Sequence, residues 1–196
     1  MKEVVIRCGI IGMLGFIGIF LSGCATTVEY GDAKSAQSLS TDFSSSDLQQ
    51  IADTMVLKMM SFPVVIDATK DRMPYIMVDK VKNKTMQHID TESLTDTITT
   101  KLIETGKFQL IDRTTDGAST EEIKTQQDSG LVDKNNALQF GKQKGAEYIL
   151  TSNLSEIQQS GRGVKDVYYK FTMSLKNIQT GVVQWKGEKE LRKVAK

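Results

Sequence analysis

The stretch DVYYKFTMSLKNI, residues 166–178, decides the fold. Large apolar residues occupy every second position from Tyr169 to Leu175, and polar residues lie between them. Successive side chains of a strand point to opposite faces of a sheet. The strict alternation therefore predicts a strand with one buried face, which places Tyr169, Phe171, Met173 and Leu175 in the core.

The neighbouring stretches extend this strand into an antiparallel meander. Residues 146–157 predict a long strand, and residues 158–164 predict the hairpin loop that connects it to residues 166–178. A tight turn at 179–181 and a last strand at 182–191 complete the meander, with Trp185 expected in its core.

An amphipathic helix is predicted near the start of the domain. Leu48, Ile51 and Met55 recur at steps of three and four residues, which favours a helix over about 46–60 with one apolar face. The polar residues 44–47 offer good N-cap chemistry, and Pro63 is expected to end the helix.

A strand–helix–strand unit is predicted next. Residues 75–81 form the first strand and residues 82–85 a polar loop, after which Thr91 caps a helix. Gly106 is expected just past the end of that helix, and residues 107–112 form the second strand. This order is typical of a βαβ-like crossover.

The segment before the meander is mostly polar. It predicts a turn at 113–118, a weak helix at 119–128, and a helix from Asp133 through Gly141. The expected fold class is therefore α+β. We expect a single domain with a mixed four- to five-stranded sheet, about four flanking helices and a C-terminal antiparallel meander.

The N-terminus resembles a bacterial lipoprotein signal. A basic start with Lys2 and Arg7 precedes the uncharged apolar run 9–20, which is too short for a comfortable membrane span. Leu21-Ser22-Gly23-Cys24 then resembles the lipobox, in which the cysteine is lipidated before cleavage. The alternatives are an uncleaved anchor helix, or a signal peptide that is cut elsewhere.

This interpretation divides the chain into three parts. Residues 1–23 form the signal peptide, residues 24–43 the lipidated N-terminus and a flexible tether, and residues 44–196 the globular domain. Two or more acyl chains give stable membrane anchoring. Ala25 follows Cys24, and the resemblance implies sorting to the periplasmic face of the outer membrane.

Composition excludes several classes of site. The chain has 25 basic and 24 acidic residues, and 23 of each remain after residues 1–23 are removed, so nucleic acid is not an expected partner. The two cysteines are Cys8, in the signal peptide, and Cys24, which carries the lipid. His88 is the only histidine. Catalytic cysteine chemistry and Cys- or His-based metal sites are therefore not expected.

No short motif in the chain points to catalysis. Gly161-Arg162-Gly163 lacks the third glycine of a phosphate loop and is interpreted as a hairpin turn. Asp67, Asp71 and Asp79 lack calcium-loop spacing, and His88 is expected to be solvated. We therefore predict a protein that is not an enzyme, with no metal and no cofactor other than the covalent lipid on Cys24.

Four segments together resemble a known family. They are YIMVDKVKNKT at 75–85, LIETGKFQLI at 102–111, GAEYIL at 145–150 and QTGVVQW at 179–185. In this order and spacing they resemble the LpoB family, outer-membrane lipoprotein activators of class A penicillin-binding proteins. Single segments are shared with related modules, namely the N-terminal domain of TolB and CsgG-like proteins.

The resemblance implies both a fold and a mechanism. The fold is a mixed sheet with helices packed on it, and the mechanism is docking on the regulatory domain of a bifunctional peptidoglycan synthase, which raises its activity. Well-known members have a long proline-rich tether, whereas the tether here is short and contains no proline.

The face that contacts the synthase is not defined by a short motif. We expect polar residues around the hairpin and the 82–85 loop to contribute, although solvated loop tips are the simpler interpretation. Two other functions stay open: a structural or assembly lipoprotein accessory to an envelope secretion or translocation complex, and a hydrolase with an unrecognised site. The candidate contact residues are Lys82, Asn83, Lys84, Arg162, Lys165 and Tyr168.

Overall fold

The computed structural model describes residues 40–113, 116–130, 132–133 and 143–196. The lipobox at 21–24, most of the tether and residues 134–141 of the helix predicted from Asp133 lie outside the described residues.

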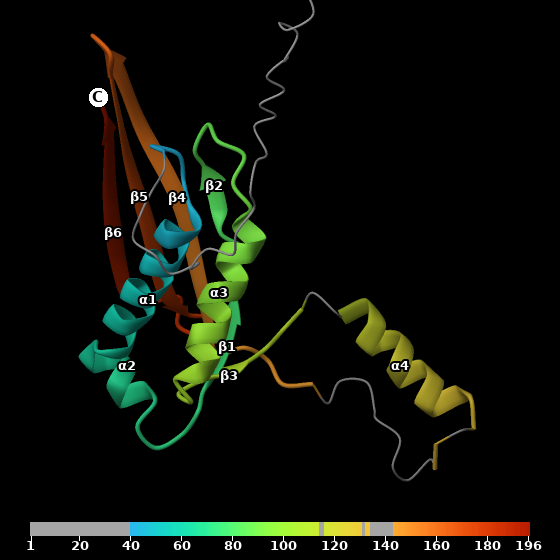
Figure 1. The fold of residues 1–196 in the computed structure, drawn as a ribbon. Helices are drawn as coiled ribbons and strands as arrows, with labels where there is room; N and C mark the ends of the chain where they lie inside the picture. Colours follow the sequence, from blue (N-terminus) through green and yellow to red (C-terminus); the bar gives the residue numbers. More distant parts are fainter. Residues whose placement is uncertain (1–39, 114–115, 131, 134–142) are drawn as a thin grey trace, which may run out of the picture. The chain divides into compact units, whose positions relative to one another are not determined.

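A mixed sheet forms the framework of the described domain (Figure 1). Its strand order is β3-β1-β4-β5-β6, and β2 pairs with β4 farther along the same edge as β1. The β1–β3, β1–β4 and β2–β4 pairs are parallel, whereas β4–β5 and β5–β6 are antiparallel. The predicted α+β class, crossover and meander are confirmed. The strands are β1 (Tyr75–Val78), β2 (Lys82–Lys84), β3 (Gln109–Leu110), β4 (Tyr148–Gly161), β5 (Val164–Asn177) and β6 (Val183–Ala195).

The hairpin between β4 and β5 is tighter than predicted. The expected loop at 158–164 is wrong, because β4 runs to Gly161 and β5 starts at Val164. Arg162 and Gly163 form the turn with φ values of 50° and 78°. Two positive φ values match the backbone twist of a two-residue hairpin turn, so the ladder continues to its end.

The expected polar loop at 82–85 is also wrong for its first three residues. Lys82–Lys84 forms β2 and pairs in parallel with Asn153–Ser155, while the first strand ends at Val78 rather than at 81. The polar sequence gives no signal for this strand, because the strand is stabilised by pairing with the edge of β4 and has no apolar face of its own.

Helices cover one face of the sheet. Contacts join α1 to α3 and to β6, and α2 to β6, so these helices lie over the meander (Figure 1). Pro63 starts α2 at its first helical position, where the missing N–H costs nothing, so a second helix follows the end of α1. The helices are α1 (Ser45–Met60), α2 (Pro63–Ala68), α3 (Thr91–Glu104) and α4 (Asp116–Asp128).

The caps of α1 and α3 follow ordinary rules. Ser44 N–H donates to the Asp47 carboxylate at 2.8 Å at the start of α1. The cap of α3 is Asp90 rather than the predicted Thr91, because the Asp90 carboxylate accepts from the N–H groups of Glu92 and Ser93. Gly106 follows α3 with φ 63°, as predicted.

The core lies between the helices and the covered face of the meander. Tyr169, Phe171, Met173 and Leu175 are all buried, as the alternation predicts, and Trp185 is buried beside them. Burying a large apolar side chain contributes about 1.5–3 kcal/mol. Ile51, Met55 and Met59 of α1 belong to the same core, so the apolar face of this helix is a packing face.

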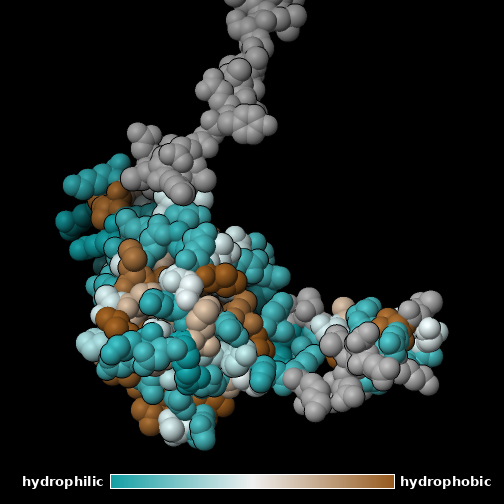
Figure 2. All heavy atoms as spheres, turned by 90° about the horizontal axis from the view of Figure 1, so that it is seen from below, coloured by the Kyte–Doolittle hydropathy of each residue, from teal (hydrophilic) through white to brown (hydrophobic). Residues whose placement is uncertain are grey.

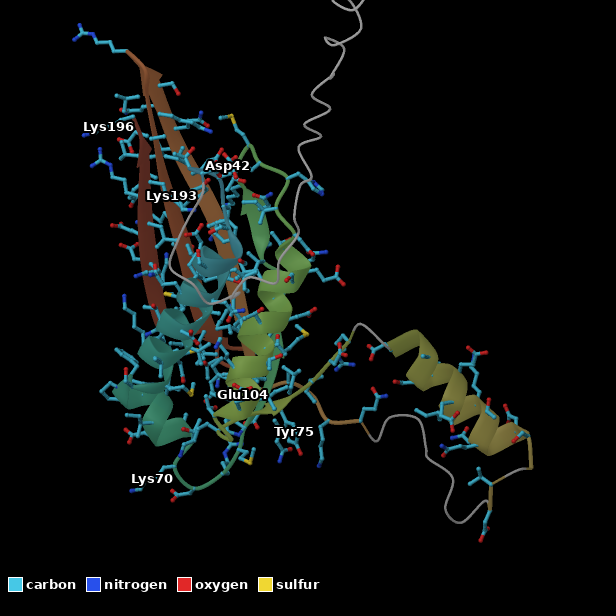
Figure 3. The ribbon with its side chains drawn as sticks, viewed as in Figure 1. Asp42, Lys70, Tyr75, Glu104, Lys193 and Lys196 are labelled. Atoms are coloured by element: carbon cyan, nitrogen blue, oxygen red, sulfur yellow. The ribbon has the colours of Figure 1, made fainter. Side chains whose placement is uncertain are left out.

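The last residues assigned to the tether are packed on the domain. Thr41 is buried, and its carbonyl accepts a hydrogen bond from Tyr169 Oη at 2.9 Å. The Phe43 ring meets the Tyr169 ring edge-on at 5.7 Å. Lys193 Nζ donates to the carbonyl of Asp42 at 2.7 Å, and Figure 3 shows Asp42 and Lys193 at the same end of the sheet. Folded structure therefore begins before residue 44.

Candidate protein-docking face

The sheet presents a second, largely polar face opposite the helices. Residues directly opposite each other in neighbouring strands share a face. One row runs Lys82–Asn153–Thr172–Glu188, the next Lys84–Ser155–Lys170–Glu190, and a third Ile157–Tyr168–Arg192. We call these eleven residues the open face. Among the described helices, the apolar faces pack on the opposite side of the sheet, and Lys58 of α1 reaches only the Glu188 carbonyl at the β6 edge.

The open face gathers three of the six predicted contact residues. Lys82, Lys84 and Tyr168 lie in its three rows. Asn83 and Lys165 alternate onto the helix-covered side, and Lys165 Nζ lies 3.2 Å from the Asp42 carboxylate. The last of the six, Arg162, is in the hairpin turn.

Ion pairs order the β5–β6 part of the open face. Lys170 Nζ lies 2.6 Å from Glu188 and 3.9 Å from Glu190. The hydrogen bond to Glu188 raises the pKa of Lys170, and the same bond lowers the pKa of Glu188. A hydrogen bond to Glu190 raises the pKa of Tyr168. These interactions link β5 to β6 across the open face.

Charged side chains occupy both edges of the open face. Lys82 and Lys84 lie on β2, and Glu188, Glu190 and Arg192 lie on β6. The Ile157–Tyr168 pair forms the third row, at one end of the face beside Arg192. Lys82 is 3.9 Å from Asp79, and its side chain is 67% exposed. An exposed apolar and aromatic pair bordered by charged side chains is a common feature of protein-docking surfaces.

Sequence reasoning missed Ile157 although a signal is present. The core positions of β4 are Tyr148, Leu150 and Leu154, which are even-numbered, and Ile157 falls on the opposite parity. Its side chain is 62% exposed. An apolar residue out of phase with the buried face of a strand marks an exposed position, and Ile157 lies directly opposite Tyr168.

Other exposed apolar groups are scattered. Phe62, Val64 and Ile66 of the α2 segment are each between 39% and 49% exposed. Figure 2, which views the molecule from below Figure 1, shows apolar side chains as separate patches among polar ones. Phe62, Val64 and Ile66 line neither of the two hollows described next.

Two hollows lie beside α3, one along its whole length and the other at its N-terminus. One, of about 670 Å³, is lined by polar residues that include Asp90, Glu92 and Asp96. The other, of about 550 Å³, is lined by Phe43, Leu48 and the exposed His88 among others. Within residues 40–113, 116–130, 132–133 and 143–196, no three His, Cys, Asp or Glu residues are grouped to hold a metal ion.

The carboxylates with shifted pKa values lie outside both hollows. The pKa of Glu147 is lowered by hydrogen bonds from Arg72, at 2.7 and 2.6 Å, and that of Asp166 by hydrogen bonds from Arg192. A general acid needs a raised pKa instead. These pairs therefore act as structural links. None of the described helices has the length and hydropathy that crossing a membrane requires.

Comparison with known proteins gives one family. The family model described as "Peptidoglycan-synthase activator LpoB" matches residues 47–191. The penicillin-binding protein activator LpoB of Dickeya dadantii is 23% identical over 117 residues, and the alignment covers 60% of this chain and 56% of the relative.

Solved structures with the same name are similar at low identity. The LpoB C-terminal domain from Escherichia coli is 22% identical, with a TM-score of 0.45 over 74% of this chain and 98% of that domain. The Salmonella enterica domain is 21% identical, with a TM-score of 0.43 over 74% and 98%. Because the family model covers most of the chain, including the whole sheet up to Leu191, the chain belongs to the LpoB family of peptidoglycan-synthase activators.

Proposed function

We propose that this protein is a non-catalytic outer-membrane lipoprotein, anchored through Cys24, that activates a bifunctional class A penicillin-binding protein. The observation that carries the proposal is the family match over residues 47–191, whose description is that of a peptidoglycan-synthase activator. The lipobox-like Leu21-Ser22-Gly23-Cys24 supports the anchor.

Activation without chemistry requires differential binding. A protein that binds the active conformation of the synthase more tightly than its inactive one shifts the population toward the active state. The open face is the surface we assign to this docking, because an exposed apolar and aromatic pair, Ile157 and Tyr168, lies there beside rows of charged side chains. Its partner is the regulatory domain of the synthase.

The test follows glycan-chain polymerisation from lipid II. The full-length protein in detergent micelles is added to each class A penicillin-binding protein of the host. We expect a faster rate with one synthase and no effect after that synthase's regulatory domain is deleted. No binding and no stimulation with any of them would overturn the proposal and favour the assembly-lipoprotein alternative.

A charge-reversal pair tests the face. Lys82→Glu with Lys84→Glu should weaken synthase binding about tenfold, which corresponds to ~1.4 kcal/mol. Lys107→Glu with Lys124→Glu is the matched control, since both lysines are exposed and lie outside the open face, Lys107 in the loop between α3 and β3 and Lys124 in α4. Equal binding by the two double variants would remove the docking role from the open face.

A further inference from the structure

In the described part of the chain, one end of the β4 edge has no neighbouring strand. On one side of β4, residues 148–150 pair with β1 and residues 153–155 with β2. Residues 157–161 keep β5 on their other side, but in the described part of the chain no strand occupies the position beyond β2. We call residues 157–161 the free edge.

The main-chain groups of the free edge have a definite direction. Asp79 N–H donates to the Leu150 carbonyl at 2.8 Å, so the main chain of Leu150 faces β1 and β2. This orientation alternates along a strand, and the β4–β5 register contains no shift. The N–H and C=O groups of Gln158 and Ser160 therefore point outward.

The chain after β2 turns away from this edge. The Asn83 side chain accepts from Thr85 N–H at 2.9 Å and from Thr85 Oγ1 at 2.7 Å. Met86 N–H then donates to the Glu156 carboxylate at 2.9 Å, and Gln87 bonds Tyr169. Glu156 and Tyr169 face the helices, so these bonds direct the segment toward the covered side of the sheet.

The free edge also lacks the protection that the other edges have. The outer strand β6 contains six charged residues, and Lys58 Nζ donates to the Glu188 carbonyl on it at 3.1 Å. At the opposite side β3 has only two residues. Charges and short length discourage strand addition. The free edge reads Ile-Gln-Gln-Ser-Gly, without a charge, and Met86 beside it is 83% exposed.

We propose that the free edge binds an extended segment of the synthase as an added strand, in line with β2. This inference rests on the proposed function. Outward N–H and C=O groups recognise an extended polypeptide, and alternate side chains of that polypeptide supply specificity. The added strand completes the third row of the open face, so a segment with an apolar side chain beside Ile157 and Tyr168 fits best.

Proline substitution tests the main-chain bonds. Gln158→Pro removes an outward N–H while the ladder to β5 is kept, since proline is tolerated where the N–H of an edge strand faces solvent. Gln158→Ala keeps the N–H and is the matched control. Full-length variants in detergent micelles are titrated with the synthase. We expect binding about tenfold weaker for Gln158→Pro and unchanged for Gln158→Ala.

Amide exchange gives a readout that does not depend on a variant. Gln158 and Ser160 amides should exchange rapidly in the free protein and slowly in the complex. Should Gln158→Pro fail to fold, as judged by its thermal midpoint, Ser160→Pro with Ser160→Ala replaces that pair and these amides still decide the question.

The outcomes are separable. Wild-type affinity of a folded proline variant, or unchanged amide exchange on binding, overturns the strand addition and leaves the proposed function standing. Protection of these amides in the free protein by self-association assigns the edge to a second copy and also overturns the inference. Failure of the wild type to bind any synthase overturns the proposed function and this inference together.

Discussion

Gly187 of β6 is a position where a single methyl group matters. A Cβ built there would lie 2.5 Å from Cζ2 of Trp185 and 3.3 Å from Cε of Met55. We expect Gly187→Ala to lower the free energy of unfolding by about 1–3 kcal/mol, because overpacking forces the indole out of its place. Urea unfolding of the folded domain measures the change.

Gly117 provides the matched control, since a Cβ there meets nothing within 4 Å. Gly117→Ala lies in α4 and should leave stability unchanged or slightly raise it. Equal stability of the Gly187→Ala variant and the wild type would contradict the packing of Trp185 over this glycine.

The pair Arg72–Glu147 makes stability depend on pH. Two hydrogen bonds from Arg72, helped by Tyr75 N–H at 3.2 Å, lower the pKa of Glu147 in the folded state. A lowered pKa stabilises the fold above the ordinary carboxylate pKa, and this contribution is lost as the pH falls through the folded-state value. The free energy of unfolding should therefore decrease below about pH 4.5.

Glu147→Gln isolates this contribution. The variant should be less stable at pH 7 and should lose less stability than the wild type between about pH 5 and pH 3. The effect is small because Arg72 is 58% exposed. Denaturant unfolding at each pH measures it, and identical acid slopes for variant and wild type would contradict the prediction.

Among the elements, the β4–β5 hairpin depends on its two-residue turn. Gly163 has φ 78°, a region that costs an L-residue about 1–2 kcal/mol. Gly163→Ala should therefore lower the free energy of unfolding by about that amount. Arg162 has φ 50°, so Arg162→Gly should be neutral or stabilising for the turn itself.

The same turn separates a structural role of Arg162 from a binding role. Arg162→Gly is expected to fold at least as well as the wild type. Any loss of synthase affinity in this variant would therefore be caused by the missing guanidinium group. Thermal midpoints together with binding titrations measure both effects. A destabilised Arg162→Gly variant would show that the positive φ of residue 162 does not limit the stability of this hairpin.

Helix ends illustrate how far local signals reach. The apolar spacing in residues 46–60 predicts α1 closely, because one face of it must meet the core. Pro63 is compatible with both an end and a start, since proline stops a helix that precedes it and suits the first position of a helix that follows. It is the packing of α2 on β6 that makes Pro63 the start of a helix here.

At the scale of the whole molecule, the residues before α1 fasten the two layers together. Lys193 of β6 bonds the Asp42 carbonyl and pairs with Asp47, which joins the sheet to the start of α1. A domain that starts at residue 44 loses the Thr41 and Phe43 contacts with Tyr169. We expect it to be about 1–3 kcal/mol less stable than a domain that starts at residue 40.

Tyr169→Phe supplies a double-mutant cycle for this contact. Removing the hydroxyl should cost more in the domain that starts at 40 than in the one that starts at 44, because the longer domain retains the Thr41 carbonyl as its acceptor. Thermal unfolding of the four proteins measures the coupling. Equal costs in both lengths would show that residues 41–43 contribute nothing through this bond.

The sequence by itself determined the fold class, the meander and the core side of β5. The reason is that periodicity of burial is a local property: every second residue from Tyr169 to Leu175 must be apolar for one face to be dry. The four family segments likewise predicted the LpoB family, which the match over residues 47–191 confirmed.

The tertiary structure decided everything that depends on a partner strand or face. Lys82–Lys84 forms a strand because β4 is long enough to pair with it, and the pattern of three polar residues does not predict this pairing. The same register divided the six predicted contact residues between the open face, the covered face and the turn. Side-chain direction in a sheet is fixed by register, and register is set by contacts that are distant in the sequence.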